Sequence, residues 1–206
     1  MKNTNEHKIP KLYGLVLAGG RSTRMGTDKG LIPYRGIPQQ EYLYQLLGTI
    51  CDTVFLSIRE EQETALTNSF NTIIDKNEYR GPFNGILSAH SNYPEVAWLV
   101  LACDLPMIDK EALQLLSNSR NTNRLATSFA TKETGLPEPL ITIWEPAGLQ
   151  KSISFLKTAK SSCPRKFLIN SDIQLVHPEQ DELLYNANSI EDYEFIKSKI
   201  ALADGG

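Results

Sequence analysis

The sequence predicts an α/β fold: a single three-layer, Rossmann-like domain with a mostly parallel central sheet and an antiparallel portion in its second half. Three observations predict this class. The length of 206 residues suits one domain with a full core. Short apolar runs alternate with helical patterns along most of the chain. These runs are continuous, as expected for strands covered on both faces, and strand–helix alternation implies right-handed crossovers between parallel strands.

The first half of the chain alternates regularly between the two kinds of element. We expect strands at 12–18, 53–58, 71–74 and 96–102. We expect helices at 38–50, 60–67, 82–91 and 109–117. Pro38 and Pro82 can each occupy a first helical turn, and Asp109 is a suitable N-cap for the helix that follows it.

The second half is less regular. We expect strands at 124–130 and 140–144, joined antiparallel around the turn at 134–135, then a helix at 146–157, a strand at 173–176 and a closing helix at 190–200. Residues 1–10 and 201–206 are expected to be disordered tails. The folded domain is therefore expected to span residues 11–201.

Composition excludes several classes of function. The net charge of −3 gives no field that would gather nucleic acid, and the apolar runs are too short to span a membrane. The three cysteines are far apart and form no CxxC pair, which is typical of reduced thiols in a cytoplasmic protein. We therefore expect a cytoplasmic protein that contacts neither nucleic acid nor membrane.

A glycine-rich turn follows the first expected strand, at 17–29. Gly19 and Gly20 allow positive φ angles and a close approach of the backbone to a ligand, and successive N–H groups can form a nest for an anion. Arg21, Arg24 and Lys29 add positive charge suited to phosphate oxygens. The alternative is a flexible surface turn with incidental basic residues.

An aspartate follows the fourth expected strand, in the segment Cys103-Asp104-Leu105-Pro106. A carboxylate at the end of a buried strand can hold Mg²⁺, which keeps several waters and takes further ligands from phosphates. The alternative is that Asp104 caps the next helix, although Asp109 is better placed for that role. We therefore expect Mg²⁺ as the cofactor and Asp104 as its ligand.

The glycine-rich turn, read as L-A-G-G-x-S-x-R-M-G-x-D-K, resembles the signature of molybdenum cofactor guanylyltransferases, nucleotidyltransferases of the glycosyltransferase-A-like fold. The resemblance implies that Leu17, Ala18 and Gly19 contact a guanine nucleotide and that Lys29 reaches its phosphates. Gly20 and Arg21 belong to the same nucleotide-binding turn, and the candidate catalytic residues are Lys29, Asp104 and Arg24. Relatives that transfer cytidylate have Ala-Ala-Gly here, so the paired glycines favour guanine.

Further segments resemble the same family. Asp75 and Gly81 match its nucleotide-binding positions, and Ser57 stands near the place of an asparagine that contacts the base. Pro139 matches a position on the acceptor side. Asn186 and Asn188 resemble a pair of asparagines in the N-x-N segment before the last helix, also on the acceptor side. Turn and capping roles are alternatives for Asp75 and both asparagines. Cations at 151–166 are expected to be mostly a solvated face, with one or two near the acceptor phosphate.

The resemblance implies transfer of GMP from GTP to the phosphate of molybdenum-molybdopterin, giving the guanine dinucleotide cofactor and pyrophosphate. Residues 11–120 would form the nucleotide-binding half and residues 121–201 the acceptor-binding half. The expected partners are GTP and a molybdopterin-type acceptor, with transient contacts to other cofactor-biosynthesis proteins. The alternatives are a cytidylyl- or sugar-phosphate nucleotidyltransferase and a non-catalytic nucleotide-binding module.

Overall fold

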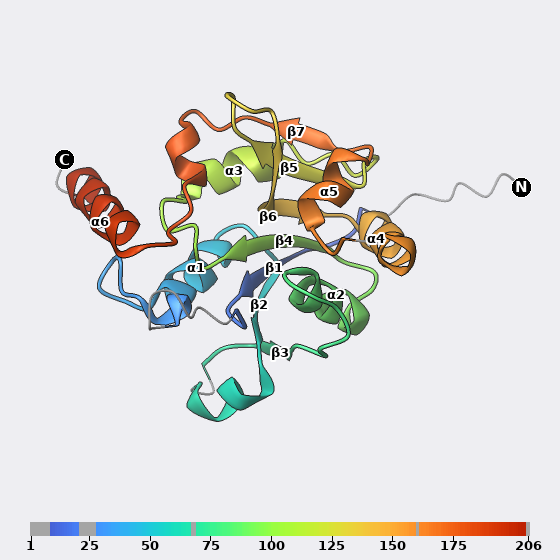
Figure 1. The fold of residues 1–206 in the computed structure, drawn as a ribbon, viewed down its shortest axis with the longest axis horizontal. Helices are drawn as coiled ribbons and strands as arrows, with labels where there is room; N and C mark the ends of the chain where they lie inside the picture. Colours follow the sequence, from blue (N-terminus) through green and yellow to red (C-terminus); the bar gives the residue numbers. More distant parts are fainter. Residues whose placement is uncertain (1–8, 21–27, 67–68, 160, 205–206) are drawn as a thin grey trace, which may run out of the picture.

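The chain folds around one mixed sheet (Figure 1). The computed structural model describes residues 9–20, 28–66, 69–159 and 161–204, and within these residues the sheet has seven strands in the order β3-β2-β1-β4-β6-β5-β7. The strands are β1 (Leu12–Leu17), β2 (Thr53–Ile58), β3 (Thr72–Ile74), β4 (Ala97–Ala102), β5 (Ala126–Ala130), β6 (Pro137–Trp144) and β7 (Gln174–Val176). Only β6 runs against its neighbours β4 and β5. The expected fold class is confirmed.

Helices lie on both faces of the sheet. The α-helices are α1 (Gln39–Leu47), α2 (Phe83–Asn92), α3 (Lys110–Asn118), α4 (Pro146–Thr158), α5 (Pro164–Ile169) and α6 (Ile190–Asp204). The 3₁₀ segments are η1 (Lys29–Leu31), η2 (Glu60–Ala65) and η3 (Asp181–Leu184). Among the described residues, no helix combines the length and the apolar character needed to cross a membrane.

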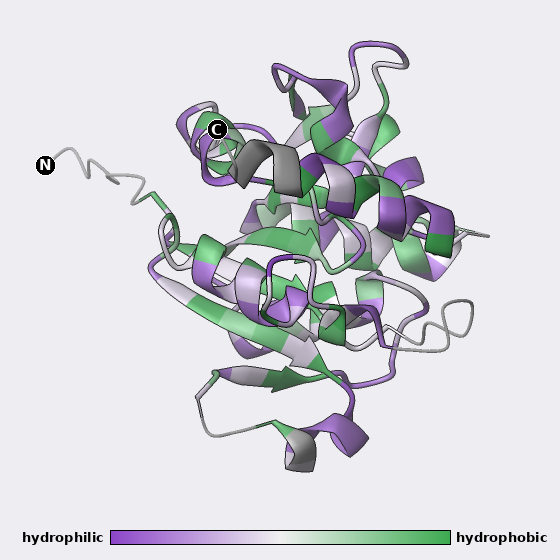
Figure 2. Cartoon of the chain, turned by 90° about the vertical axis from the view of Figure 1, so that its left-hand side faces the viewer, coloured by the Kyte–Doolittle hydropathy of each residue, from purple (hydrophilic) through white to green (hydrophobic). Residues whose placement is uncertain are grey.

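Successive side chains of the central strands point to opposite faces of the sheet, and each face packs into its own hydrophobic core. Leu99 and Leu101 of β4 join the core beneath α1 and α3, whereas Trp98 and Val100 join the core beneath α2, α4 and α5. All four side chains are fully buried, which explains why this strand is continuously apolar in sequence. Figure 2 shows the hydrophobic colours concentrated on the sheet and the hydrophilic ones on the helices. This is the expected three-layer arrangement.

Several elements differ from expectation, among them the helix expected at 60–67, which is the 3₁₀ segment η2. The last helix continues to Asp204, so residues 201–204 are helical rather than a tail. Strand β6 begins at Pro137 rather than at 140. A proline is tolerated at the first position of a strand and at a bulge, and the register between β5 and β6 shifts between Ser128 and Ala130. Helix α5 was not expected. The expected N-terminal tail falls mostly on residues 1–8, outside the described residues.

A buried ion pair joins the two halves of the fold. Arg120, after α3, donates from Nε to Glu145 Oε1 at 2.6 Å and from Nη2 to Oε2 at 2.9 Å, and Nη2 also donates to the Pro10 carbonyl at 3.0 Å. Glu145 directly follows β6 and is only 2% exposed. The pair therefore fixes the end of α3, the start of β1 and the end of β6 to one another.

We predict that Glu145→Gln lowers the free energy of unfolding by about 3 kcal/mol, because it leaves a buried guanidinium without its counter-charge. Chemical denaturation measures this. The matched control is Glu182→Gln, which removes an exposed pair with Lys199 and should change stability by less than about 1 kcal/mol. Equal, small effects of both substitutions would contradict the prediction.

Candidate functional site

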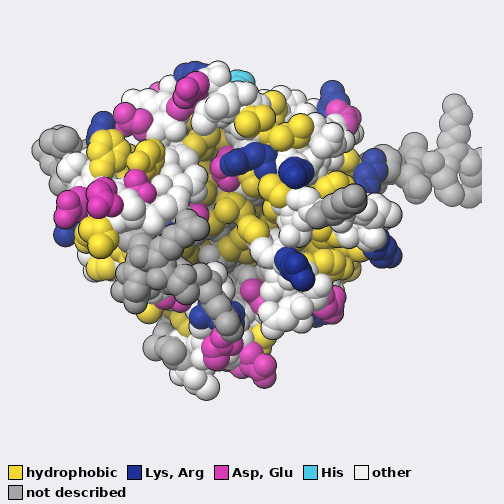
Figure 3. Space-filling view, viewed as in Figure 1, with side chains coloured by type: hydrophobic (Ala, Val, Ile, Leu, Met, Phe, Trp, Pro, Cys, Tyr) yellow, Lys and Arg dark blue, Asp and Glu magenta, His cyan; other side chains and the backbone are white. Residues whose placement is uncertain are grey.

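A cavity of about 700 Å³ opens where the parallel strands end. Residues at or just beyond the carboxyl ends of β1, β2, β3 and β4 line it, as expected for ligand sites in open α/β sheets. Its wall includes the expected nucleotide-binding residues that are described: Leu17, Ala18, Gly19, Gly20, Lys29, Ser57, Asp75, Gly81 and Asp104. The face of the molecule in Figure 3 is hollowed near its centre, where hydrophobic side chains are visible with charged ones around them.

The glycine-rich turn needs glycine for a different reason from the one expected. Neither Gly19 nor Gly20 takes a positive φ angle. Instead, a Cβ atom on Gly19 would lie 2.7 Å from Asp75 Oδ2, so Gly19 allows the carboxyl group to approach the backbone. Arg21 and Arg24 lie outside the described residues.

The side chain of Lys29, at the end of this turn, contacts the C-terminal part of the chain. Its Nζ donates to the Ala187 carbonyl at 2.7 Å and to Asn188 Oδ1 at 2.8 Å. Asn188 lines the same cavity as Lys29. The expected acceptor-side asparagine is therefore in direct contact with the expected phosphate-binding lysine.

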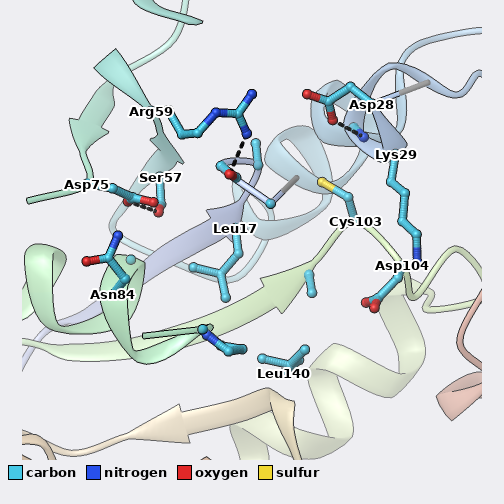
Figure 4. Close-up of a pocket in the computed structure, with 18 of the residues that line it drawn as sticks. Leu17, Asp28, Lys29, Ser57, Arg59, Asp75, Asn84, Cys103, Asp104 and Leu140 are labelled. Carbon is cyan, nitrogen blue, oxygen red and sulfur yellow. Dashed lines mark hydrogen bonds between the residues drawn. The ribbon is translucent and has the colours of Figure 1, made fainter. Parts of the chain in front are cut away.

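Asp104 projects from the end of β4 toward the same side of the cavity as Lys29 (Figure 4). Its carbonyl accepts from the Ala187 N–H at 2.8 Å, whereas its Oδ1 is buried and has no hydrogen-bond partner among the described residues. Burial raises the pKa of this carboxyl group, and the Lys29 charge counteracts part of that rise. Asp109 caps α3 through a 2.8 Å bond from the Ala112 N–H, so Asp104 does not serve as that cap.

The opposite end of the cavity holds a second carboxyl group. Ser57 donates to Asp75 Oδ1 at 2.6 Å, which fixes the orientation of that carboxyl. Helix α2 approaches this pair closely at Gly85, where a Cβ atom would lie 2.3 Å from Ser57 Oγ. Burial raises the pKa of Asp75, while the Ser57 hydrogen bond, the Arg59 charge and Asn84 lower it.

A second cavity of about 450 Å³ shares part of its wall with the first, at Gly81, Pro82 and Leu140. Pro139 and Asn186, two of the expected acceptor-side residues, line it. Arg165 of α5 also lines it and donates from Nη2 to Glu138 Oε2 at 2.5 Å. Burial raises the pKa of Glu138, and the Arg165 charge opposes this rise.

Several residues of the first cavity were not singled out from sequence. Arg59 donates from Nη1 to the Gly19 carbonyl at 2.5 Å (Figure 4), and Asp28 accepts from the Gly30 N–H at 3.0 Å. Asn84 and Leu140 complete the wall. Their positions arise from contacts between distant segments, and only Asp28, inside the glycine-rich motif, carried a local signal.

The described residues contain no group of three or more His, Cys, Asp and Glu side chains that could hold a metal ion by themselves. The three cysteines are free thiols. A cation in the first cavity would therefore need ligands beyond the His, Cys, Asp and Glu side chains of the described residues. Phosphate oxygens and water are such ligands for Mg²⁺.

Residues 14–174 match the family model described as a MobA-like NTP transferase domain. A molybdenum cofactor biosynthesis bifunctional protein of Synechocystis is 42% identical over 88% of this chain, which covers 52% of that relative. A molybdenum cofactor guanylyltransferase of Pseudomonas fluorescens is 31% identical, with 91% of this chain and 94% of the relative covered. The solved structure of molybdopterin-guanine dinucleotide biosynthesis protein A from Archaeoglobus fulgidus has a TM-score of 0.73 at 17% identity, covering 92% and 98% of the two chains. The chain thus spans about half of the first relative and nearly all of the other two.

We predict that Asp75→Asn raises the free energy of unfolding at neutral pH in the absence of ligand. Because burial raises the pKa of Asp75 above 3.8, the folded state binds more protons than the unfolded state as pH rises from 3.8 through the folded pKa, and stability is lost over that range. The amide cannot ionise and avoids this loss.

Denaturation curves of both proteins from pH 3 to pH 8 measure the effect. The gain in the variant should disappear below about pH 3.8, where the carboxyl is protonated in both states. A variant less stable than the wild type at pH 7 would contradict the assignment of burial as the dominant influence on Asp75.

Proposed function

The chain belongs to the family of MobA-like NTP transferase domains, and from this we propose that it transfers GMP from GTP to the phosphate of molybdenum-molybdopterin. The products are the guanine dinucleotide form of the cofactor and pyrophosphate. The observation that carries the proposal is that Lys29 and Asp104 line one cavity together with the glycine-rich turn. The relatives named as molybdenum cofactor guanylyltransferases support the choice of nucleotide and acceptor.

We place the nucleotide across the first cavity. Its base lies at the Ser57–Asp75 end, where a carboxylate can accept hydrogen bonds from the N–H groups on one edge of guanine. Leu17, Ala18 and Gly81 line the wall beside it. The triphosphate runs from there past the backbone of Gly19, which lies beside Asp75, and of Gly20 toward the Lys29 ammonium at the other end. Arg21 and Arg24 retain their proposed roles in contacting the triphosphate, with Arg24 catalytic.

Asp104 fits a divalent cation. A buried carboxylate oxygen without a hydrogen-bond partner is costly unless a cation or a donor completes it. We propose that Asp104 would hold Mg²⁺ when nucleotide is bound, and the ion would supply neutralisation of charge on the triphosphate and the leaving pyrophosphate. The remaining ligands would come from phosphate oxygens and water.

The acceptor occupies the second cavity in this proposal. Pro139 and Asn186 line that cavity, and Asn188, held by Lys29, stands toward the nucleotide. Arg165 is the cation best placed for the acceptor phosphate, since it is about half exposed and oriented by the buried Glu138. The shared wall at Leu140 allows the acceptor phosphate to approach the α-phosphorus of the nucleotide.

The chemistry requires positioning more than proton transfer. An oxygen of the acceptor phosphate, already anionic near neutral pH, attacks the α-phosphorus of GTP. As that P–O bond forms, the bond to the β-phosphate oxygen breaks, and pyrophosphate leaves with the electron pair. No general base is required. The chain contributes orientation and charge stabilisation through the glycine turn, Lys29 and Asp104.

We also propose that the reaction takes place in the cytoplasm. Three free cysteines are in keeping with a reducing compartment. Transient contacts with other cofactor-biosynthesis proteins would deliver the acceptor and remove the product.

We predict that Lys29→Ala and Asp104→Ala each lower kcat/KM by about 10²–10³-fold, the effect of removing one preorganised charge-stabilising group. The assay is pyrophosphate release with GTP, Mg²⁺ and the molybdopterin-type acceptor. Lys157→Ala, which changes an exposed lysine of α4, is the control and should leave kcat/KM unchanged. Wild-type rates in both site variants would contradict the mechanism. Faster release with CTP or ATP than with GTP would instead contradict the choice of base.

We predict that Arg165→Met raises the KM for the acceptor about tenfold or more and leaves the KM for GTP unchanged, because it removes a charge-assisted contact in the second cavity only. Initial rates measured as a function of each substrate test this. A change confined to the KM for GTP would place the acceptor elsewhere.

A further inference from the structure

The short segment η2 carries a glutamine whose side chain bridges two parts of the glycine-rich region. Gln62 Nε2 donates to the Ala18 carbonyl at 3.1 Å and to Asp28 Oδ2, also at 3.1 Å. Ala18 immediately follows β1, and Asp28 immediately precedes Lys29. The amide group of one side chain therefore donates hydrogen bonds to two residues that are ten positions apart in the chain. Gln62 itself does not line the cavity.

Arg59 completes the arrangement from the end of β2. Its backbone N–H donates to Gln62 Oε1 at 2.9 Å, which fixes the orientation of the Gln62 amide. Its guanidinium donates to the Gly19 carbonyl from Nη1 and to Glu61 from Nε at 2.9 Å. The side chains of Arg59 and Gln62 thus fix the positions of Ala18, Gly19 and Asp28 relative to one another.

Asp28 also restrains the backbone of Lys29, the residue that follows it. Its Oδ1 accepts from the Gly30 N–H, which caps η1 and fixes the backbone from which Lys29 projects. Its Oδ2 is the oxygen held by Gln62. The spacing between the Gly19 backbone and the Lys29 backbone is therefore set by Arg59 at one end and by Gln62, through Asp28, at the other.

A purely local role accounts for only one of the three hydrogen bonds of the Gln62 side chain. The bond from the Arg59 N–H to Gln62 Oε1 caps η2 and would serve a structural turn equally well. Capping gives no reason for Nε2 to contact Ala18 and Asp28. Both contacts are made to residues of the glycine-rich turn, where small displacements alter the fit of a polyphosphate.

We infer that Gln62 is a positioning residue for the nucleotide: by joining Ala18 to Asp28 it sets the spacing between the glycine turn and Lys29 at which a nucleoside triphosphate binds. This inference rests on the proposed function, since it takes the triphosphate to lie at that end of the first cavity. It assigns a role to η2, a segment that neither lies in the glycine-rich motif nor was expected to contribute to the site.

The test compares the binding of GTP to three variants by calorimetry with Mg²⁺ present. Gln62→Met keeps the length of the side chain and removes its polar atoms. Gln62→Glu keeps the oxygen that caps η2 and removes both donors to Ala18 and Asp28. Glu63→Gln, at an exposed position of the same segment, is the matched control.

We expect both Gln62 variants to weaken GTP binding on the order of tenfold, the ratio that corresponds to one hydrogen bond to a charged group. The control should bind as the wild type does. The KM for the acceptor should stay unchanged in all three.

Wild-type affinity for GTP in Gln62→Glu would overturn the inference. An equal rise in the KM of both substrates, with a large loss of thermal stability, would also overturn it, because that pattern indicates a structural role alone. A wild-type protein that binds no GTP would instead overturn the proposed function on which the inference rests.

Discussion

The parallel register between β1 and β4 is the constraint on which the site depends. Leu17 stands opposite Ala102 in that register, so the two strands end side by side. The residues just after β1 form the glycine turn, and the residues just after β4 deliver Asp104. Because both strands are buried on both faces, a shift by one residue would move every core side chain to the wrong face. The core therefore fixes the geometry at which a backbone turn and a carboxylate can share one ligand.

The second half of the chain completes the cavity rather than forming a separate wall. Strand β6 lies between β4 and β5 and brings Leu140 to the boundary of the two cavities. The segment before α6 returns to the first half, where the Ala187 N–H donates to the Asp104 carbonyl and Lys29 donates to Ala187 and Asn188. The two expected halves, 11–120 and 121–201, thus meet at the pair formed by Lys29 and Asn188. We propose that this meeting point is where nucleotide and acceptor phosphates face each other.

Local patterns predicted most of the fold because burial on both faces makes the strands continuously apolar. They also predicted the cap at Asp109, where a short-range hydrogen bond forms. The pattern failed where long-range contacts decide the outcome. Gly19 is needed for its approach to Asp75, which is 56 positions further along the chain, and Arg59 enters the site by contacting Gly19. Strand β6 starts earlier than expected, at a proline, where the register between β5 and β6 shifts. No spacing rule within one segment contains that information.

The most direct test of the central claim is a crystal structure of the protein with a non-hydrolysable GTP analogue and Mg²⁺. We expect the triphosphate to lie between the Gly19–Gly20 backbone and Lys29, with the ion on Asp104 and the base beside Asp75. A triphosphate bound outside the first cavity, or an ion held without Asp104, would contradict the account.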